Sequence, residues 1–367
     1  MTSVRNCLIA SSILTLAFAL SVESSLAQIR QPVASPYASV SEEVGLTQIT
    51  IKYGRPAVNG REIWGGLVPY GFSKPLPNFG NGKDYPWRAG ANVNTNISFE
   101  HDVLIEGKPL SAGRYGLHMI PSETDWVVMF NNDADSWGSF YYEESNDALR
   151  VTVTPEAAPF KERLTYEFLD HDGQGGVTVA LFWGDKKIPI RVQVDDYHSV
   201  VLASMEEELF NRGGFTFQNY AAIAGYAIAN NVDLDQGVVW ADRAIAANTS
   251  FFTQSLKGRL MLRQSKVAEA DAFMAPLIEA STENELNLYG YQLMGMGLTD
   301  EAQEVFELNI QRHPDSWNPY DSLGECLMNR GDHKNAKKYY SMALDKLPEN
   351  DQANRDRINQ LLATMGP

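Results

Sequence analysis

Residues 317–350 read WNPYDSLGECLMNRGDHKNAKKYYSMALDKLPEN, and residues 283–316 read ENELNLYGYQLMGMGLTDEAQEVFELNIQRHPDS. Aligned without a gap, the two segments place residues of the same kind at the same positions, so the chain repeats itself with a period of 34 residues. The matched positions are Gly290 with Gly324, Gly297 with Gly331, Ala302 with Ala336, Phe306 with Tyr340, and Pro314 with Pro348. A period of about 20 to 50 residues is typical of proteins built from stacked copies of one small unit.

The spacing within one copy predicts two helices that cross closely. Gly331 lies between two stretches with helical periodicity, and Pro348 follows the second stretch, where proline ends a helix. We expect Gly324 and Ala336 at the helix crossing, because a bulky side chain there would push the helices apart. The corresponding residues of the preceding copy are predicted to have the same packing roles.

This pattern resembles the tetratricopeptide repeat. The residues that carry the resemblance are Tyr320, Leu323, Gly324, Leu327, Ala336, Tyr340, Ala343 and Pro348. Asn309 departs from the family pattern, in which alanine is usual at that position. Fainter copies precede these two, so we expect four helix pairs over 215–350 and a capping helix over 351–365. About three such units are needed to bury a continuous core.

Stacked helix pairs of this kind form a curved array with a groove, and the resemblance implies that the groove binds a peptide or a partner protein. The alternative is a structural array that braces the rest of the chain or mediates self-association. No row of Lys or Arg suited to a peptide carboxylate is evident, so the class of ligand stays open.

The chain upstream of residue 195 has a different periodicity. After a polar lead-in over 28–43, apolar and polar residues alternate in short runs separated by turn residues, which predicts about nine strands. The runs are centred on 49–53, 97–99, 103–105, 115–119, 126–130, 149–153, 164–168, 177–183 and 188–194. Two antiparallel sheets packed face to face, or one sheet closed into a barrel, would bury their apolar faces. The prolines and glycines of 72–86 predict a long surface loop, either a tolerated insertion or a lid.

This region resembles the bacterial family called domain of unknown function 2911 over about 36–194. The segments that carry the resemblance are 52–56, 60–65, 67–71, 87–92, 113–121, 126, 130–131 and 136–138. In that family only a few residues separate the 67–71 and 87–92 segments, which favours an insertion at 72–86. The resemblance implies an exported β-domain, often joined to helical repeats, and it implies no activity.

Several polar and aromatic residues of these segments are candidates for a binding site. They are Arg55, Arg61, Arg88, Asn92, His118, Tyr70 and Trp87. Arginines with neighbouring aromatic rings suit a carboxylate, a phosphate or sugar hydroxyl groups. The alternative is structural, because arginine planes also stack on rings and donate to loop carbonyls. His118 lies between apolar residues of a predicted strand, which favours a core histidine over a catalytic base.

No motif specifies a reaction. The chain has no nucleophile elbow, no zinc-protease motif, no Cys-x-x-Cys pair and no phosphate-binding loop. Asn131, Asp133 and Asp135 alternate as in a calcium loop, but Ser136 stands where such a loop has glycine, so we expect no metal. We expect no cofactor either, and a non-enzymatic protein. An enzyme that uses Arg55, Arg88, Asn92 and His118 is the alternative.

The formal net charge of −16 argues against nucleic acid as a partner, because phosphates require basic patches. Residues 1–27 are typical of a secretory signal, with Arg5 before an apolar run and Ala27 before the expected cleavage site. Cleavage would leave no membrane span, and it would leave Cys326 as the only cysteine, which we expect to be buried.

The sequence therefore predicts a multidomain β plus α protein. It consists of a signal peptide at 1–27, an all-β domain at 36–194, a helical linker at 195–214 and tetratricopeptide-like repeats at 215–367. We expect a periplasmic or secreted binding or assembly protein of the cell envelope, whose helical groove binds a protein. The alternative is an envelope enzyme or glycan-binding protein with a polar site on the β-domain.

Overall fold

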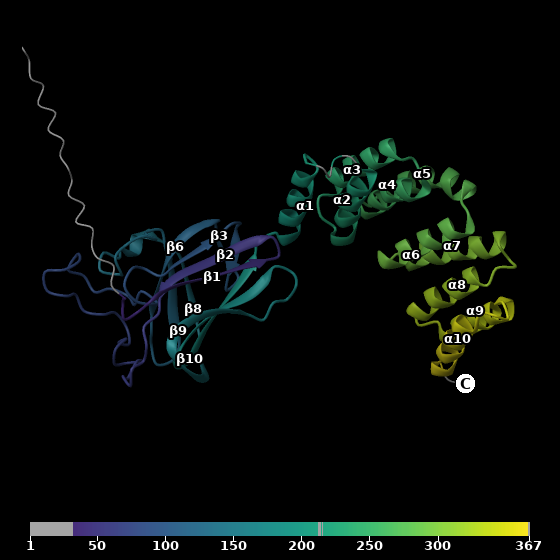
Figure 1. Cartoon of the computed structure of the whole chain (residues 1–367). Helices are drawn as coiled ribbons and strands as arrows, with labels where there is room; N and C mark the ends of the chain where they lie inside the picture. Colours follow the sequence, from purple (N-terminus) through teal and green to yellow (C-terminus); the bar gives the residue numbers. More distant parts are fainter. Residues whose placement is uncertain (1–31, 212–213, 215, 366–367) are drawn as a thin grey trace, which may run out of the picture.

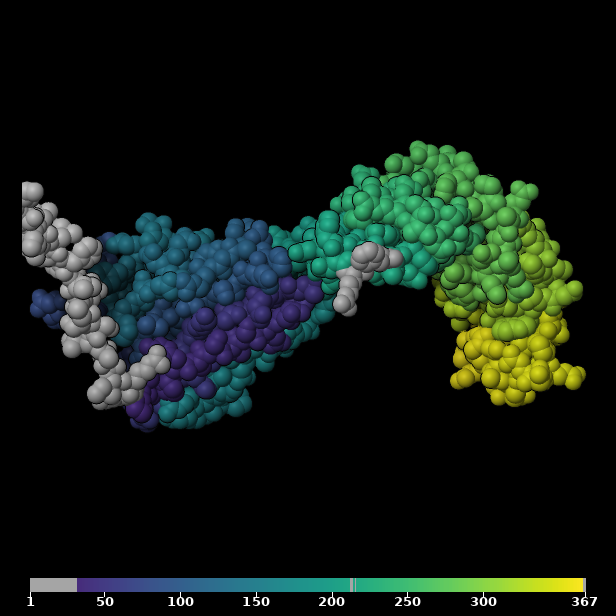
Figure 2. Space-filling view, turned by 45° about the horizontal axis from the view of Figure 1, so that its top comes forward, coloured from purple at the N-terminus to yellow at the C-terminus, as the bar shows by residue number. Residues whose placement is uncertain are grey.

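The structure is a computed structural model that describes residues 32–211, 214 and 216–365. A β-domain (residues 32–194) comes first and a helical part (residues 197–364) follows it, and the helices follow a bent path away from one end of the β-domain (Figures 1 and 2). The predicted signal segment 1–27 lies outside the described residues. Within the described ranges, no helix is long and apolar enough to cross a bilayer.

The β-domain contains two separate antiparallel sheets, so the barrel alternative does not apply to residues 32–194. The strands are β1 (Tyr37–Val44), β2 (Thr47–Gly54), β3 (Asn96–Phe99), β4 (Val103–Ile105), β5 (Lys108–Leu110), β6 (Gly113–Ile120), β7 (Trp126–Asn131), β8 (Asp147–Val153), β9 (Glu156–Leu169) and β10 (Gly176–Val194). One sheet has the order β1-β2-β3-β6-β7-β8 and the other has the order β5-β4-β10-β9. A short 3-10 helix, η1 (Glu144–Asn146), precedes β8.

Both sheets contribute to one hydrophobic core. In β2, Ile49, Ile51 and Tyr53 are buried while the residues between them are less so, which is the alternation expected of a strand with one face inward. Val192 and Val194 of β10 and Trp126 of β7 belong to the same buried cluster. The alternation that predicted the strands therefore reflects which side of each strand faces the other sheet.

The strand predictions differ from the structure at three places. The polar lead-in contains β1, an edge strand whose residues Ser41, Glu42 and Glu43 pair with β2. The segment that follows the predicted strand at 103–105 contains the short strand β5, which begins at Lys108. The runs at 177–183 and 188–194 form one strand, β10, because irregular pairing with β9 around Gly184 lets the strand continue.

The helical part follows the predicted scheme of four pairs and a terminal helix, preceded by α1. The helices are α1 (Tyr197–Glu208), α2 (Phe217–Asn230), α3 (Leu234–Ala247), α4 (Phe251–Arg263), α5 (Val267–Ala280), α6 (Glu283–Gly295), α7 (Thr299–Arg312), α8 (Asn318–Asn329), α9 (His333–Lys346) and α10 (Gln352–Thr364). Side-chain caps begin several of them; for example, Thr282 and Glu285 form a capping box at the start of α6. Gly297 and Gly331 have φ angles of 80° and 78° in the turns inside two pairs, where glycine is favoured.

Helix α1 links the β-domain to the helical part. Its first residue, Tyr197, packs against the core of the β-domain, and its Leu202 belongs to the buried cluster of α2, α3 and α4. The ring of Tyr197 lies so close to Gly45 and Gly175 that a Cβ on either glycine would clash with it. Tyr197 is therefore a wedge that fixes α1 on the end of the β-domain.

Candidate functional site

The candidate site residues of the β-domain fall into two groups. Arg61, Trp87, Arg88 and Asn92 line one cavity of about 360 Å³. Trp183 of β10, which was not among the candidates, forms part of the same wall. Ser73 and Tyr85, which pair with each other at the base of the 72–86 loop, also line the cavity.

The two arginines of this cavity are held by loop carbonyl groups. Arg61 donates to the carbonyl oxygens of Val58 and Ala57, at 3.0 and 2.5 Å. Arg88 donates from Nη1 to the carbonyl oxygen of Asn92 at 2.6 Å, and its guanidinium lies 4.8 Å from the ring centroid of Phe140. These contacts stabilise irregular backbone, which is the structural role that the sequence analysis gave as the alternative for these arginines.

Two of the residues that line the cavity, Trp87 and Trp183, belong to an aromatic cluster. Trp87 and Trp183 stack with their ring centroids 6.0 Å apart and an interplanar angle of 15°. Trp64 contacts both of them edge to face, and it also contacts Trp126 of β7. Aromatic pairs in these arrangements contribute beyond the area that they bury. The cluster thus gives the cavity a rigid apolar wall.

Three candidates lie elsewhere. Arg55 donates to the carbonyl oxygen of Leu164 and to the hydroxyl of Thr165, so it joins the strand β9 to the end of β2. Tyr70 is exposed and lies beside Gly65. His118 is in the interior of the six-stranded sheet, with 2% of its surface exposed. The set Arg55, Arg88, Asn92 and His118 that the enzyme alternative requires does not line one cavity.

His118 belongs to a closed polar network. Its Nδ1 lies 2.8 Å from the hydroxyl oxygen of Ser139, which is also buried. Burial lowers the pKa of His118 to about 4, because the charged imidazolium would lose its hydration, and Arg88 also lowers it while Asp147 and Asp133 oppose the shift. The imidazole is therefore neutral at pH 7, and its burial gives a substrate no access to it.

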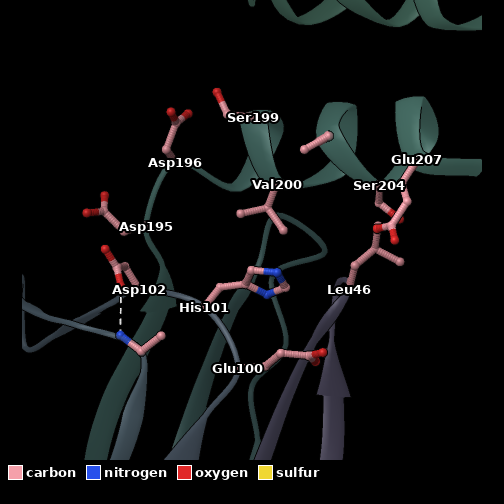
Figure 3. A pocket seen from close by; sticks show the side chains of 12 residues that line it. Leu46, Glu100, His101, Asp102, Asp195, Asp196, Ser199, Val200, Ser204 and Glu207 are labelled. Carbon is pink, nitrogen blue, oxygen red and sulfur yellow. Dashed lines mark hydrogen bonds between the residues drawn. The ribbon is translucent and has the colours of Figure 1, made fainter.

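A second cavity lies at the junction of the β-domain and α1 and measures about 660 Å³ (Figure 3). Side chains of Glu100, Asp102, Asp195 and Glu207 surround it, together with His101, which contacts Thr47. Among the residues that the structure describes, no cluster of His, Cys, Asp and Glu has the arrangement of a metal site. One of these carboxylates, that of Asp102, accepts a hydrogen bond from the backbone N–H group of Ala112 at 2.6 Å.

The packing residues of the repeats lie at contacts between helices. A Cβ on Gly290 would lie 2.5 Å from the ring of Phe306, and one on Gly324 would lie 3.0 Å from the ring of Tyr340. Ala302 and Ala336 are completely buried. Small residues on one helix thus accommodate an aromatic ring of the next, which is how each pair closes.

The array is interrupted between its second and third pairs. α3 packs along α4 and α7 packs along α8, whereas α5 and α6 approach each other at few points. The buried residues of the helical part form two clusters, one over α1–α4 and one mainly over α6–α10, and the second cluster also includes Phe251 of α4 and Met274 of α5. A separation between α5 and the α6/α7 pair is visible in Figure 1.

A groove of about 440 Å³ occupies this interruption. Its apolar floor consists of Leu262, Val267, Met274, Ala275, Ile278, Tyr289, Leu293, Val305 and Leu308. Four exposed carboxylates border it, from Asp271 and Glu279 of α5 and from Glu301 and Glu304 of α7. The sequence predicted a groove, but nothing in it indicated that this one lies between the second helices of two consecutive pairs.

The acid border of this groove is not neutralised within the chain. Among the described residues, none of the four carboxylates forms an ion pair. The one basic lining residue, Arg312, donates to the carbonyl oxygens of Ile278 and Glu279 at the end of α5. The groove therefore combines an apolar floor with an acidic border.

Comparison with known proteins bears mainly on the β-domain. No match to a curated protein was found. The helical part is similar to MamA from Desulfovibrio magneticus RS-1, with 16% identity and a TM-score of 0.26 over 42% of this chain and 89% of that chain. It is also similar to YrrB, described as a TPR protein with an unusual peptide-binding site, with 14% identity and a TM-score of 0.24 over 43% of this chain and 82% of that one. Because both TM-scores are low, the tetratricopeptide-like assignment rests on the helix pairs themselves. Residues 35–192, which make up nearly all of the β-domain, match the model of a family described as protein of unknown function (DUF2911).

Proposed function

We propose that this chain is an exported binding protein of the cell envelope, whose helical part docks a basic, amphipathic segment of a partner protein. The docking surface is the groove between α5 and α7. The observation that carries the proposal is the combination of an apolar floor with four carboxylates that have no ion-pair partner among the described residues. An apolar groove of this kind fits one face of an amphipathic helix.

Charge complementarity selects the partner. The four carboxylates outnumber Arg312, whose guanidinium is already occupied by two carbonyl groups. An acidic segment would be repelled, while Lys or Arg side chains flanking an apolar face would be attracted. The chain itself carries a formal charge of −16, so its whole surface favours the approach of basic partners.

The test uses a defined probe. A fluorescein-labelled model peptide with a Leu stripe and Lys on its other positions is titrated with the full mature chain, and binding is followed by fluorescence anisotropy. The same peptide with Glu in place of Lys serves as the probe of opposite charge. The variant Glu301→Gln with Glu304→Gln removes two charges from the border, and Glu269→Gln with Glu349→Gln removes two exposed charges elsewhere.

We expect the Lys peptide to bind and the Glu peptide not to bind. Because an exposed charge pair contributes about 0.2 to 1 kcal/mol, the groove variant should weaken binding about 2- to 30-fold. The control variant should bind like the wild type. Equal weakening by both variants would show that net charge alone attracts the peptide, and the docking surface would then have to be abandoned.

Sedimentation of the chain without peptide distinguishes docking of a partner from self-association. The proposal predicts a monomer at micromolar concentration. A dimer that the Glu301→Gln and Glu304→Gln variant dissociates would assign the groove to a second copy of the chain and would contradict docking of a partner.

Export is tested by expressing the full-length chain in cells that have a secretion pathway. The apolar run that ends before Gln28 supports cleavage after Ala27. The expected result is a mature protein whose first residue is Gln28, identified by intact mass in the extracytoplasmic fraction. Retention of the first 27 residues in a cytoplasmic protein would contradict the envelope location.

A further inference from the structure

The cavity of the β-domain differs in charge from the chain as a whole. The formal net charge is −16. Yet the lining contains no carboxylate, and its two charged side chains are Arg61 and Arg88. The two guanidinium groups give this cavity a positive charge, and that charge would attract an anion.

Arg88 lacks a counter-ion. It forms no ion pair with a described residue, and its charge is compensated by one carbonyl and one aromatic face. Burial lowers the pKa of Arg88, and Tyr85 partly opposes this shift. Removing a charged group from water without a partner is costly, so an anion beside the guanidinium would stabilise it.

The guanidinium of Arg88 is fixed in place. Gly138 makes room for it, because a Cβ on that residue would lie 2.4 Å from Nη1. The carbonyl group of Asn92, a residue with a φ of 67°, holds the same nitrogen from the other side. A donor that is already immobilised loses little freedom when a ligand binds, which favours affinity.

Trp183 contributes a hydrogen-bond donor to the cavity lining in addition to the arginines. The indole Nε1 of Trp183 is buried and unpaired among the described residues, and 1% of this side chain is exposed. Buried donors in proteins are almost always satisfied, so an unsatisfied one in a cavity wall points to a missing acceptor. The same wall therefore holds a cation without a counter-ion among the described residues and an N–H group without an acceptor.

We propose that this cavity binds a small organic anion through its carboxylate, which is anchored by Arg88 with the indoles of Trp87 and Trp183 against the ligand. The planar guanidinium of Arg88 matches the two oxygens of a carboxylate, which it can bind with two parallel hydrogen bonds. The volume of about 360 Å³ is within the range of small-molecule sites. The site is separate from the α5–α7 groove, so its failure would leave the docking proposal intact.

The carboxylate has two possible sources, a sugar acid or a free organic acid, and the probes distinguish them. The full mature chain is labelled with 5-fluorotryptophan, and its ¹⁹F resonances are assigned by single Trp→Phe variants. Sodium glucuronate, sodium acetate and glucose are titrated separately. Trp240 and Trp317, which belong to the helical part, are internal controls.

We expect saturable shifts of Trp87 and Trp183 with glucuronate and none with glucose. Acetate that binds as tightly as glucuronate would identify a free acid, and at least tenfold weaker acetate binding would identify a sugar acid. Either result supports the proposal, because both require the carboxylate. Equal responses to glucose and glucuronate, or no saturable shift with either anion, would overturn it.

The variant Arg88→Gln should weaken glucuronate binding at least tenfold. Arg114→Gln is the matched control, because Arg114 is an exposed arginine paired with Asp135 outside this cavity, and it should bind like the wild type. If Arg88→Gln does not fold, Arg88→Lys keeps the charge but loses the planar fork, and weaker binding is again expected. Unchanged affinity in a folded Arg88 variant would refute the assignment of the anchor.

Discussion

Replacing Gly290 with alanine should destabilise the helical part, although alanine is the better helix former. Gly290 lies inside α6, and an ideal Cβ built on it would lie 2.5, 2.6 and 2.9 Å from three carbons of the Phe306 ring. That ring is completely buried, so it has no empty space into which to move. The substitution therefore sets helix propensity against overpacking.

The magnitude follows from the two opposing effects. Alanine favours the helix by about 1 kcal/mol over glycine, while forcing a methyl group into a packed core costs about 1 to 3 kcal/mol. The net destabilisation should be about 1 kcal/mol for Gly290→Ala. Gly324→Ala should cost less, because its Cβ would lie 3.0 to 3.1 Å from the Tyr340 ring.

The assay is urea unfolding of the full chain, followed by circular dichroism at 222 nm, where the helices dominate the signal. With a urea dependence of about 1 to 3 kcal/mol per molar, the Gly290→Ala midpoint should fall by about 0.3 to 1 M. Gly225→Ala in α2 is the control, since no atom lies within 4 Å of its Cβ and the midpoint should not fall. If Gly290→Ala is as stable as Gly225→Ala, the close crossing of α6 and α7 is wrong.

Three further predictions concern other parts of the chain. The pKa of His118 is about 4 in the folded state and about 6.5 in the unfolded state, so the unfolded chain takes up this proton first as the pH falls. The free energy of unfolding should therefore decrease by up to about 3 kcal/mol between pH 6.5 and pH 4. The advantage of the wild type over His118→Gln in urea should therefore shrink over that range, and a constant difference would contradict the assigned pKa. Tyr197→Ala should weaken the packing of α1 on the β-domain and speed proteolysis near residue 195, whereas Tyr141→Ala at an exposed position should not. Equal cleavage of the two variants would contradict the packing role of Tyr197. Cys326 is buried and burial raises the pKa of its thiol, so a thiol reagent should modify it only in urea, and rapid modification of the native chain would show that it is accessible.

The repeat period was predictable because each copy must satisfy the same contacts. Gly290 and Gly324 face aromatic rings at the same offset, and this local requirement appears directly in the sequence. The strand β1 was not predictable in this way, because Ser41, Glu42 and Glu43 are polar and the strand lies at an edge. The conformation of β1 is determined by its backbone pairing with β2. The polarity of the side chains does not indicate that pairing.

The candidate sites were only partly predictable, because each depends on long-range contacts. Arg88 and Trp87 line the same cavity as Trp183, which is about one hundred residues later in the chain, at the end of the predicted strand 177–183. Arg55, which stands between Gly54 and Pro56, was also a candidate but donates to β9 instead. The α5–α7 groove depends on the sparse packing of α5 against α6, and no pattern of residues indicates sparse packing between two helices.

Methyl NMR of the groove tests the docking of a basic segment most directly. The full mature chain is labelled at the methyl groups of Met and Ile, and the Lys-bearing amphipathic peptide is titrated into it. Met274 and Ile278 line the groove, whereas Met342 lies in α9 outside it. We predict that the Met274 and Ile278 resonances shift and saturate together while Met342 is unchanged. A peptide that binds without shifting Met274 and Ile278 would contradict the proposed docking surface.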